Sequence, residues 1–207
     1  AGTNQTVASQ TYGNLKLSSS SGAAVKTLPV VTLTVIGNMS SAIGTGTSVS
    51  YTAIGTVNVN GNVSIGASTT FNGGSSFHTI GGNWTNNGTF NASTGTIALA
   101  GTGAQLGGSG AHNFYNLSVS GANFSFSNVP ISVASNLTSS GSGSFSQISG
   151  GSITMTGSGK VINGSGMTFG NLDITGSITA MTAISISGNL IVSGSLAGNS
   201  SITMSGT

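Results

Sequence analysis

The chain has 207 residues, and only four of them are charged: three lysines and one aspartate. A soluble domain usually has about a quarter of its residues charged. Paired-carboxylate hydrolysis, phosphoryl transfer and a catalytic triad all need acids or cations that are missing here. A net charge of +2 cannot form a basic nucleic-acid surface, and no apolar run approaches the roughly 20 residues of a membrane span. We therefore expect no enzyme, no cofactor, no nucleic-acid partner and no membrane span.

Short alternating apolar segments, separated by Gly, Ser, Asn and Thr, follow one another along the chain and predict β-strands. Three phrases recur among them. The first is an aromatic residue, any residue, Asn and Leu. The second is two apolar residues two positions apart, followed by Asn and an apolar residue, and the third is Ile-x-Leu/Met-x-Gly. In chain order the copies are the first phrase at 12–17, the second at 33–39 and 57–63, the third at 97–101, the first at 114–119, the second at 131–137, the third at 153–157, the first at 169–174, the second at 184–190 and the third at 202–206.

The phrases return at a nearly constant interval. A degenerate copy of the second phrase places Asn83 before Trp84, and the same slot returns 53 residues later at Asn136 and again at Asn189. Internal repeats of this period indicate a repeat architecture. We therefore expect one repetitive β domain over 1–207, made of about four units at approximately 1–52, 53–100, 101–156 and 157–207.

The repeat predicts an all-β fold of the β-solenoid type. Inward residue types recur at fixed offsets, as stacked rungs require, because like residues then form ladders about 4.8 Å apart. If one strand and its turn take roughly 18 residues, the chain forms about 11 rungs. An array of β-sandwich units, whose strands also alternate, is the alternative.

Asparagines in the first two phrases are predicted to serve the corners between strands, where a side-chain amide can bond to backbone groups. The scarcity of charge fits the same fold, because like charges on adjacent rungs would repel each other. The predicted ladder or turn residues are Asn14, Asn38, Asn62, Asn116, Asn136, Asn171 and Asn189.

Sequons for N-glycosylation are frequent in this chain. Asn171 and Asn189 occupy the same repeat slots as Asn116 and Asn136 but lack the sequon. Those slots therefore need Asn for the structure, and the better glycan candidates are the sequons in predicted turns. These candidates are Asn4, Asn87, Asn91, Asn123, Asn163 and Asn199.

Other conspicuous residues favour structural roles. Trp84 takes the place that Leu137 and Leu190 hold in their phrases, which predicts a core position, with sugar stacking as the alternative. His78 and His112 lie 34 residues apart without a nearby acid, so we expect no metal site. With one Asp and no Glu, the stability is expected to depend little on pH.

The stretches GNWTNNGTFNASTGTIALAGTGAQ at 82–105 and FYNLSVSG at 114–121 resemble the β-strand repeats of long secreted bacterial and archaeal surface proteins. Similar repeats occur in β-solenoid passengers of adhesins and autotransporters. The resemblance implies an extracellular or cell-surface location. We expect a structural subunit or segment of an extracellular filament or surface fibre. The alternative is an adhesin rod that binds host or surface ligands, with a cell-surface or matrix polysaccharide as a further candidate partner.

The repeat phase at the N-terminus matches the phase at which the sequence stops, which predicts a head-to-tail homopolymer. In that arrangement the end strands of one copy would continue the sheets of the next. The predicted subunit interface is Ala1, Gly2, Thr3, Val7, Tyr12, Leu15, Ile202, Met204 and Thr207.

Overall fold

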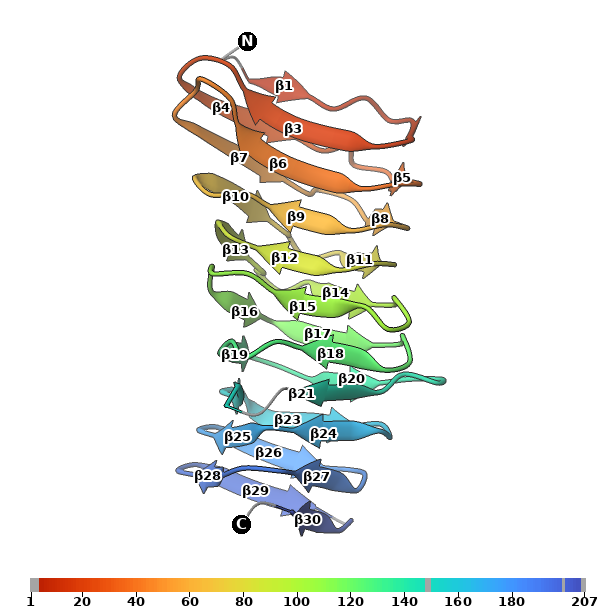
Figure 1. Cartoon of the computed structure of the whole chain (residues 1–207), viewed down its shortest axis with the longest axis vertical. Helices are drawn as coiled ribbons and strands as arrows, with labels where there is room; N and C mark the ends of the chain where they lie inside the picture. Colours follow the sequence, from red (N-terminus) through yellow and green to blue (C-terminus); the bar gives the residue numbers. More distant parts are fainter. Residues whose placement is uncertain (1–3, 148–149, 199, 206–207) are drawn as a thin grey trace.

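The alternating segments form thirty short strands that wind into ten stacked coils, as the computed structural model shows (Figure 1). The structure describes residues 4–147, 150–198 and 200–205, and within these ranges it contains no helix. Each coil contributes three strands, one to each of three faces. The N-terminal coil lies at one end of the rod and the C-terminal coil at the other.

Two faces are continuous sheets of ten strands. We call them face 1 and face 2. Face 1 contains β2 (Thr11–Tyr12), β5 (Leu33–Val35), β8 (Val57–Val59), β11 (Phe77–Ile80), β14 (Thr96–Leu99), β17 (Asn116–Val119), β20 (Leu137–Ser139), β23 (Ser158–Asn163), β26 (Ser177–Ala180) and β29 (Ser195–Gly198). Face 2 contains β3 (Leu15–Ser19), β6 (Met39–Ile43), β9 (Val63–Ile65), β12 (Trp84–Asn86), β15 (Gln105–Gly107), β18 (Phe124–Phe126), β21 (Phe145–Gln147), β24 (Met167–Phe169), β27 (Ile184–Ile186) and β30 (Ile202–Met204).

The third face, called face 3, is divided into two sheets of five strands. Its N-terminal sheet contains β1 (Gln5–Thr6), β4 (Ala23–Thr27), β7 (Ser48–Thr52), β10 (Thr69–Asn72) and β13 (Thr89–Asn91). Its C-terminal sheet contains β16 (His112–Phe114), β19 (Ile131–Val133), β22 (Ser152–Met155), β25 (Asn171–Ile174) and β28 (Leu190–Val192).

The recorded strand pairs are all parallel and stack like residues on like, which confirms the β-solenoid and excludes the antiparallel sandwich alternative. On face 3, for example, Tyr51 pairs with Phe71 and Phe71 with Phe90. The expected number of rungs was close, but a coil holds three strands rather than one. Successive coils are 24 residues apart at Asn14 and Asn38, and 18 apart at Asn171 and Asn189.

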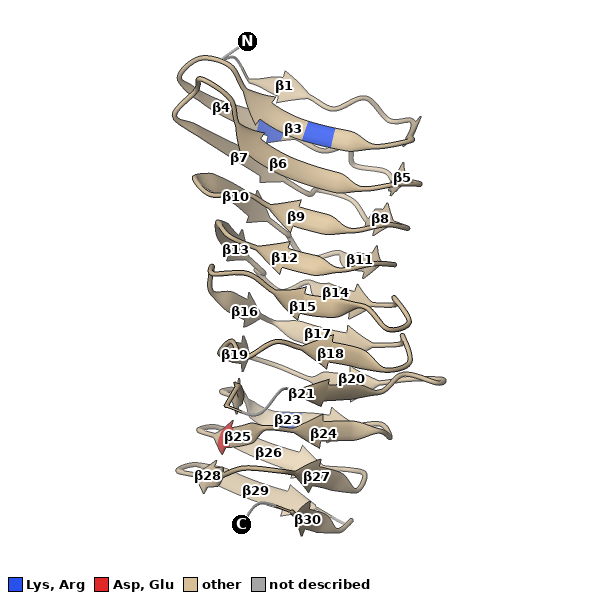
Figure 2. Ribbon diagram, viewed as in Figure 1, with Lys and Arg blue, Asp and Glu red and all other residues tan. Residues whose placement is uncertain are grey.

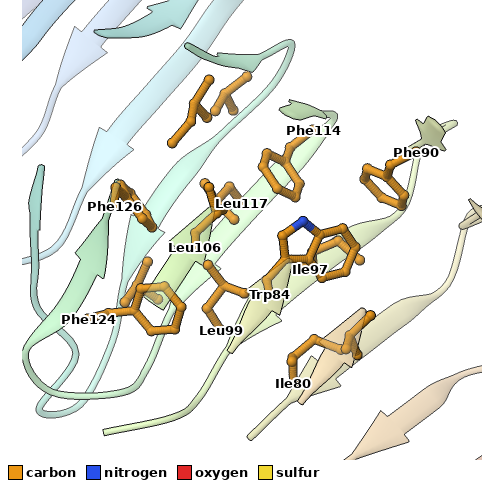
Figure 3. Packing of buried hydrophobic residues seen from close by; sticks show 14 of the residues in the cluster. Ile80, Trp84, Phe90, Ile97, Leu99, Leu106, Phe114, Leu117, Phe124 and Phe126 are labelled. Carbon is orange, nitrogen blue, oxygen red and sulfur yellow. The ribbon is translucent and has the colours of Figure 1, made fainter. Parts of the chain in front are cut away.

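Alternation places one set of side chains inside the rod, where they form a continuous core (Figure 3). Trp84 is fully buried, stacked between Val63 and Leu106 of the adjacent coils, which confirms its predicted core position. Its ring lies 4.9 Å from that of Phe90 and 5.8 Å from that of Phe114. The core is therefore built from columns of side chains that run along the rod axis.

The repeated phrases do not stack on one another. Asn83 precedes β12 on face 2, Asn136 precedes β20 on face 1 and Asn189 precedes β28 on face 3. The interval of 53 residues therefore covers eight strands, not a whole number of coils. Each copy of the phrase turns a different corner of the triangle.

Candidate functional site

One asparagine ladder runs along the corner that leads from face 1 to face 2. The backbone N–H of Asn38 donates to Asn14 Oδ1 at 2.7 Å, and that of Asn62 donates to Asn38 Oδ1 at 2.8 Å. The ladder continues from Asn83 N to Asn62 Oδ1 at 2.7 Å and from Gln105 N to Asn83 Oδ1 at 2.9 Å. Each amide oxygen thus satisfies a backbone donor in the next coil, where the corner interrupts the sheet.

The other predicted corner asparagines form separate, shorter ladders. Between face 3 and face 1, Asn136 N donates to Asn116 Oδ1 at 3.2 Å and Val161 N donates to Asn136 Oδ1 at 3.1 Å. Between face 2 and face 3, Asn189 N donates to Asn171 Oδ1 at 2.8 Å. The predicted set is therefore distributed over three corners and is not brought together into one array.

A glycine precedes the asparagine at the tightest of these contacts, a signal that the sequence contains and that the prediction missed. A Cβ on Gly61 would lie 2.6 Å from Asn38 Oδ1 and 2.6 Å from the Gly37 carbonyl oxygen. At the looser corner Ser135 precedes Asn136 instead. Gly-Asn therefore marks a corner where the backbone of one coil lies directly on the amide of the coil before it.

The candidate glycosylation residues lie on the surface wherever the structure describes them. Asn4, Asn87, Asn91, Asn123 and Asn163 are exposed, and Asn199 lies outside the described residues. They are not free of ladder roles as a group, because Val25 N donates to Asn4 Oδ1 at 3.1 Å and Ser109 N donates to Asn87 Oδ1 at 3.0 Å.

The attachment atom for a glycan is Nδ2, and its surroundings separate these candidates. Asn91 Nδ2 donates to Asn72 Oδ1 at 2.8 Å, so this amide is already engaged. Asn87 uses only Oδ1 in its bonds to Ser109. Asn123 adopts a left-handed φ of 54° in an exposed turn. Asn87 and Asn123 are therefore better placed for modification than Asn91.

Both histidines are inside the rod. His78 lies on face 1, where Val57 N donates to its Nδ1 at 3.0 Å and its Nε2–H donates to the Gly73 carbonyl at 2.6 Å. Burial lowers the pKa of His78 below its ordinary value. His112 is 1% exposed in β16, and neither ring nitrogen has a partner of good hydrogen-bond geometry. Burial lowers the pKa of His112 as well, more than the backbone of Gly108 offsets.

These two imidazoles do not form part of a metal site. Within the described residues, no group of three or more His, Cys, Asp or Glu side chains gathers as metal ligands would. The expectation that stability is independent of pH is nevertheless wrong in its premise. It counted carboxylates and overlooked two buried imidazoles that must stay neutral.

The charged residues lie towards the two ends of the rod, and a long central part has none (Figure 2). Lys16 on β3 is exposed, whereas Lys26 on β4 is only 3% exposed and its Nζ donates to Gln5 Oε1 at 2.6 Å. Lys160 lies on β23 and Asp173 on β25. A cleft of about 450 Å³ at the first coil is lined by Gln5, Tyr12 and both N-terminal lysines, among others.

The predicted interface residues lie at the two ends of the rod, in part outside the described residues. Ala1, Gly2, Thr3 and Thr207 belong to the ranges that the structure does not describe. Val7 and Tyr12 are partly buried and Leu15 is buried. Ile202 and Met204 continue the inward columns of Ile184 and Ile186, yet they are 37% and 48% exposed. The core is thus open at the last described coil.

The interruption of face 3, which we call the seam, lies between β13 and β16. Among the described residues, no backbone hydrogen bond joins these two strands. The chain just before β16 is held elsewhere, because Asn86 Nδ2 donates to the Ala111 carbonyl at 2.8 Å and Gly110 N donates to the Asn86 carbonyl at 2.7 Å. A surface groove of about 330 Å³ follows the seam.

Comparison with known proteins adds no assignment: no family model, no curated protein and no solved structure matches the chain. The described residues contain no helix that is long and apolar enough to cross a membrane.

Proposed function

We propose that the chain is a structural rod, a subunit or segment of an extracellular filament or surface fibre whose coils continue head to tail. One observation carries the proposal. The inward columns of face 2 keep their apolar character up to the last described strand, where Ile202 and Met204 are left exposed. A further coil stacked on β30 would bury both side chains and pair the open strand edge.

The charge distribution supports the same role. The residues from 27 to 159 include no Lys, Arg, Asp or Glu. Neighbouring coils and neighbouring rods therefore meet without like-charge repulsion. The extracellular or cell-surface location rests on the likeness of the 82–105 and 114–121 stretches to secreted surface repeats.

Electron microscopy of the purified chain tests the proposal directly. We expect long threads of uniform width. Aspartates at the inward positions, in the double variant Ile202→Asp and Met204→Asp, should leave single rods, because buried charges would face the next coil. Thr203→Asp is the matched control on the same strand, since Thr203 pairs with the outward Ser185. Threads of normal length from the double variant would show that the head-to-tail contact is wrong.

The alternative function is an adhesin rod that binds a surface ligand, and the seam groove is the observation that favours it. Single rods from the unaltered chain, with no threads at any concentration tested, would favour this alternative over the filament.

A further inference from the structure

We propose that the seam groove on face 3 binds a neutral saccharide. The proposal does not depend on polymerisation, because the groove lies midway along the rod and not at its ends. Its walls come from two coils. Asn91 and Ser93 belong to or follow β13, and Asn113, Tyr115 and Ser132 lie on or next to β16 and β19.

The seam leaves backbone groups available inside the groove. In a parallel strand, alternate residues direct both their N–H and C=O to the same neighbouring strand. The Asn91 carbonyl accepts from Gly73 N on one side, so the backbone groups of Phe90 point towards the seam. The Phe114 carbonyl accepts from Ala134 N on the other side, so those of Asn113 also point towards it. Both Phe90 and Asn113 line the groove.

These groups call for a ligand that can both donate and accept hydrogen bonds. Two free N–H groups and two free carbonyls are a poor match for an anion or a cation, whereas sugar hydroxyls serve both kinds. The amide of Asn113 and the hydroxyls of Ser93 and Ser132 add the same mixed chemistry. No charged side chain lines the groove, so the charge on an ionic ligand would have no partner there.

An aromatic side chain completes the arrangement. Tyr115 is half-buried at the corner after β16, and within the described residues its hydroxyl has no recorded hydrogen bond. Beneath it, the rings of Phe90 and Phe114 lie 5.6 Å apart and are almost fully buried, which gives the groove a rigid apolar floor. A flat ring beside amides and hydroxyls suits the apolar face and polar rim of a pyranose.

Hydrogen–deuterium exchange of the whole chain tests the inference, whether the chain forms single rods or threads. The probes are cellohexaose, maltohexaose and N-acetylchitohexaose at about 5 mM, which is above a Kd of about 1 mM. At least one should slow exchange in peptides that cover 89–93 and 112–115. If none of them does so, or if the protection falls elsewhere, the inference is wrong.

Variants and a charged probe sharpen the test. Calorimetric affinity should fall at least about tenfold, or about 1.4 kcal/mol, in Tyr115→Ala and in the exposed variant Asn113→Ala. Phe77→Ala is the matched control, because Phe77 is 52% exposed on face 1, away from the seam. Hexagalacturonate should bind more weakly than the best neutral probe. Equal affinity for hexagalacturonate, or loss of binding in Phe77→Ala, would overturn the assignment.

Discussion

Faces 1 and 2 are continuous ladders of ten strands, whereas face 3 is broken once between β13 and β16. The core does not follow that break. The aromatic column Tyr51, Phe71 and Phe90 continues to Phe114 across the seam, with ring centroids 4.8 to 5.6 Å apart. Side-chain stacking therefore holds the rod together where backbone pairing fails. On the other two faces both kinds of contact act at once.

The largest effect is expected from removing an aromatic side chain at the seam. Phe114→Ala should lower the free energy of unfolding by about 3–5 kcal/mol, the usual loss for a buried Phe. Phe126→Ala on face 2 is equally buried and should lose a similar amount. Hydrogen exchange distinguishes them. Only Phe114→Ala should speed exchange in β13 and β16, where no backbone ladder remains. Equal acceleration there in both variants would contradict the proposed role of side chains at the seam.

A corner between the continuous faces should be sensitive to a single methyl group. Gly61→Ala places a Cβ 2.6 Å from two oxygens of the preceding coil, and such overpacking usually costs about 1–3 kcal/mol. Gly13→Ala is the matched control, because it also precedes a ladder asparagine but nothing lies within 4 Å of its Cβ position. Chemical denaturation should show a loss for the first variant and almost none for the second. Similar midpoints for both would refute the tight-corner interpretation.

The two histidines compare a continuous face with the seam through pH. The pKa of each is lowered by burial, so the folded chain keeps both neutral while unfolded imidazoles bind protons below about 6.5. Stability is therefore complete above that pH and falls as the pH drops through it. Denaturant midpoints at about pH 7.5 and pH 5 measure the fall.

Substitution separates the two contributions. His112→Leu at the seam should be neutral or stabilising at neutral pH, because its ring nitrogens lack good partners, and it should reduce the fall at low pH. His78→Leu should be destabilising at neutral pH, because it leaves Val57 N and the Gly73 carbonyl unsatisfied. An unchanged pH dependence in His112→Leu would show that this residue is not the titrating group.

The smallest effect concerns the ladders. Asn38→Ala should cost about 1 kcal/mol, the typical net value of one hydrogen bond. Asn136→Ala, at the corner beside face 3, should cost less, because its bonds of 3.1 and 3.2 Å are longer than the 2.7 and 2.8 Å bonds of Asn38. Thermal unfolding of the two variants tests the order. The reverse order would mean that bond length at the corners does not reflect strength.

The sequence was sufficient for the solenoid and for the burial of Trp84, because alternation and repeated inward residues leave few other folds. It was not sufficient for the number of strands per coil, because successive copies of one phrase lie on different faces. The seam was also hidden. Asn86 looks like an ordinary outward amide in the sequence, and only its burial under the 108–111 turn reveals that it holds the chain away from β13.

The eight-strand interval has a consequence for how such a rod can lengthen. Eight is one short of three full coils, so each copied segment starts one face further round than its predecessor. Because the same phrase turns all three corners, a duplicated segment would still fold after this rotation of one third of a turn. Whatever a copy displays outward then winds around the axis as a spiral staircase, and no side of the rod collects every copy.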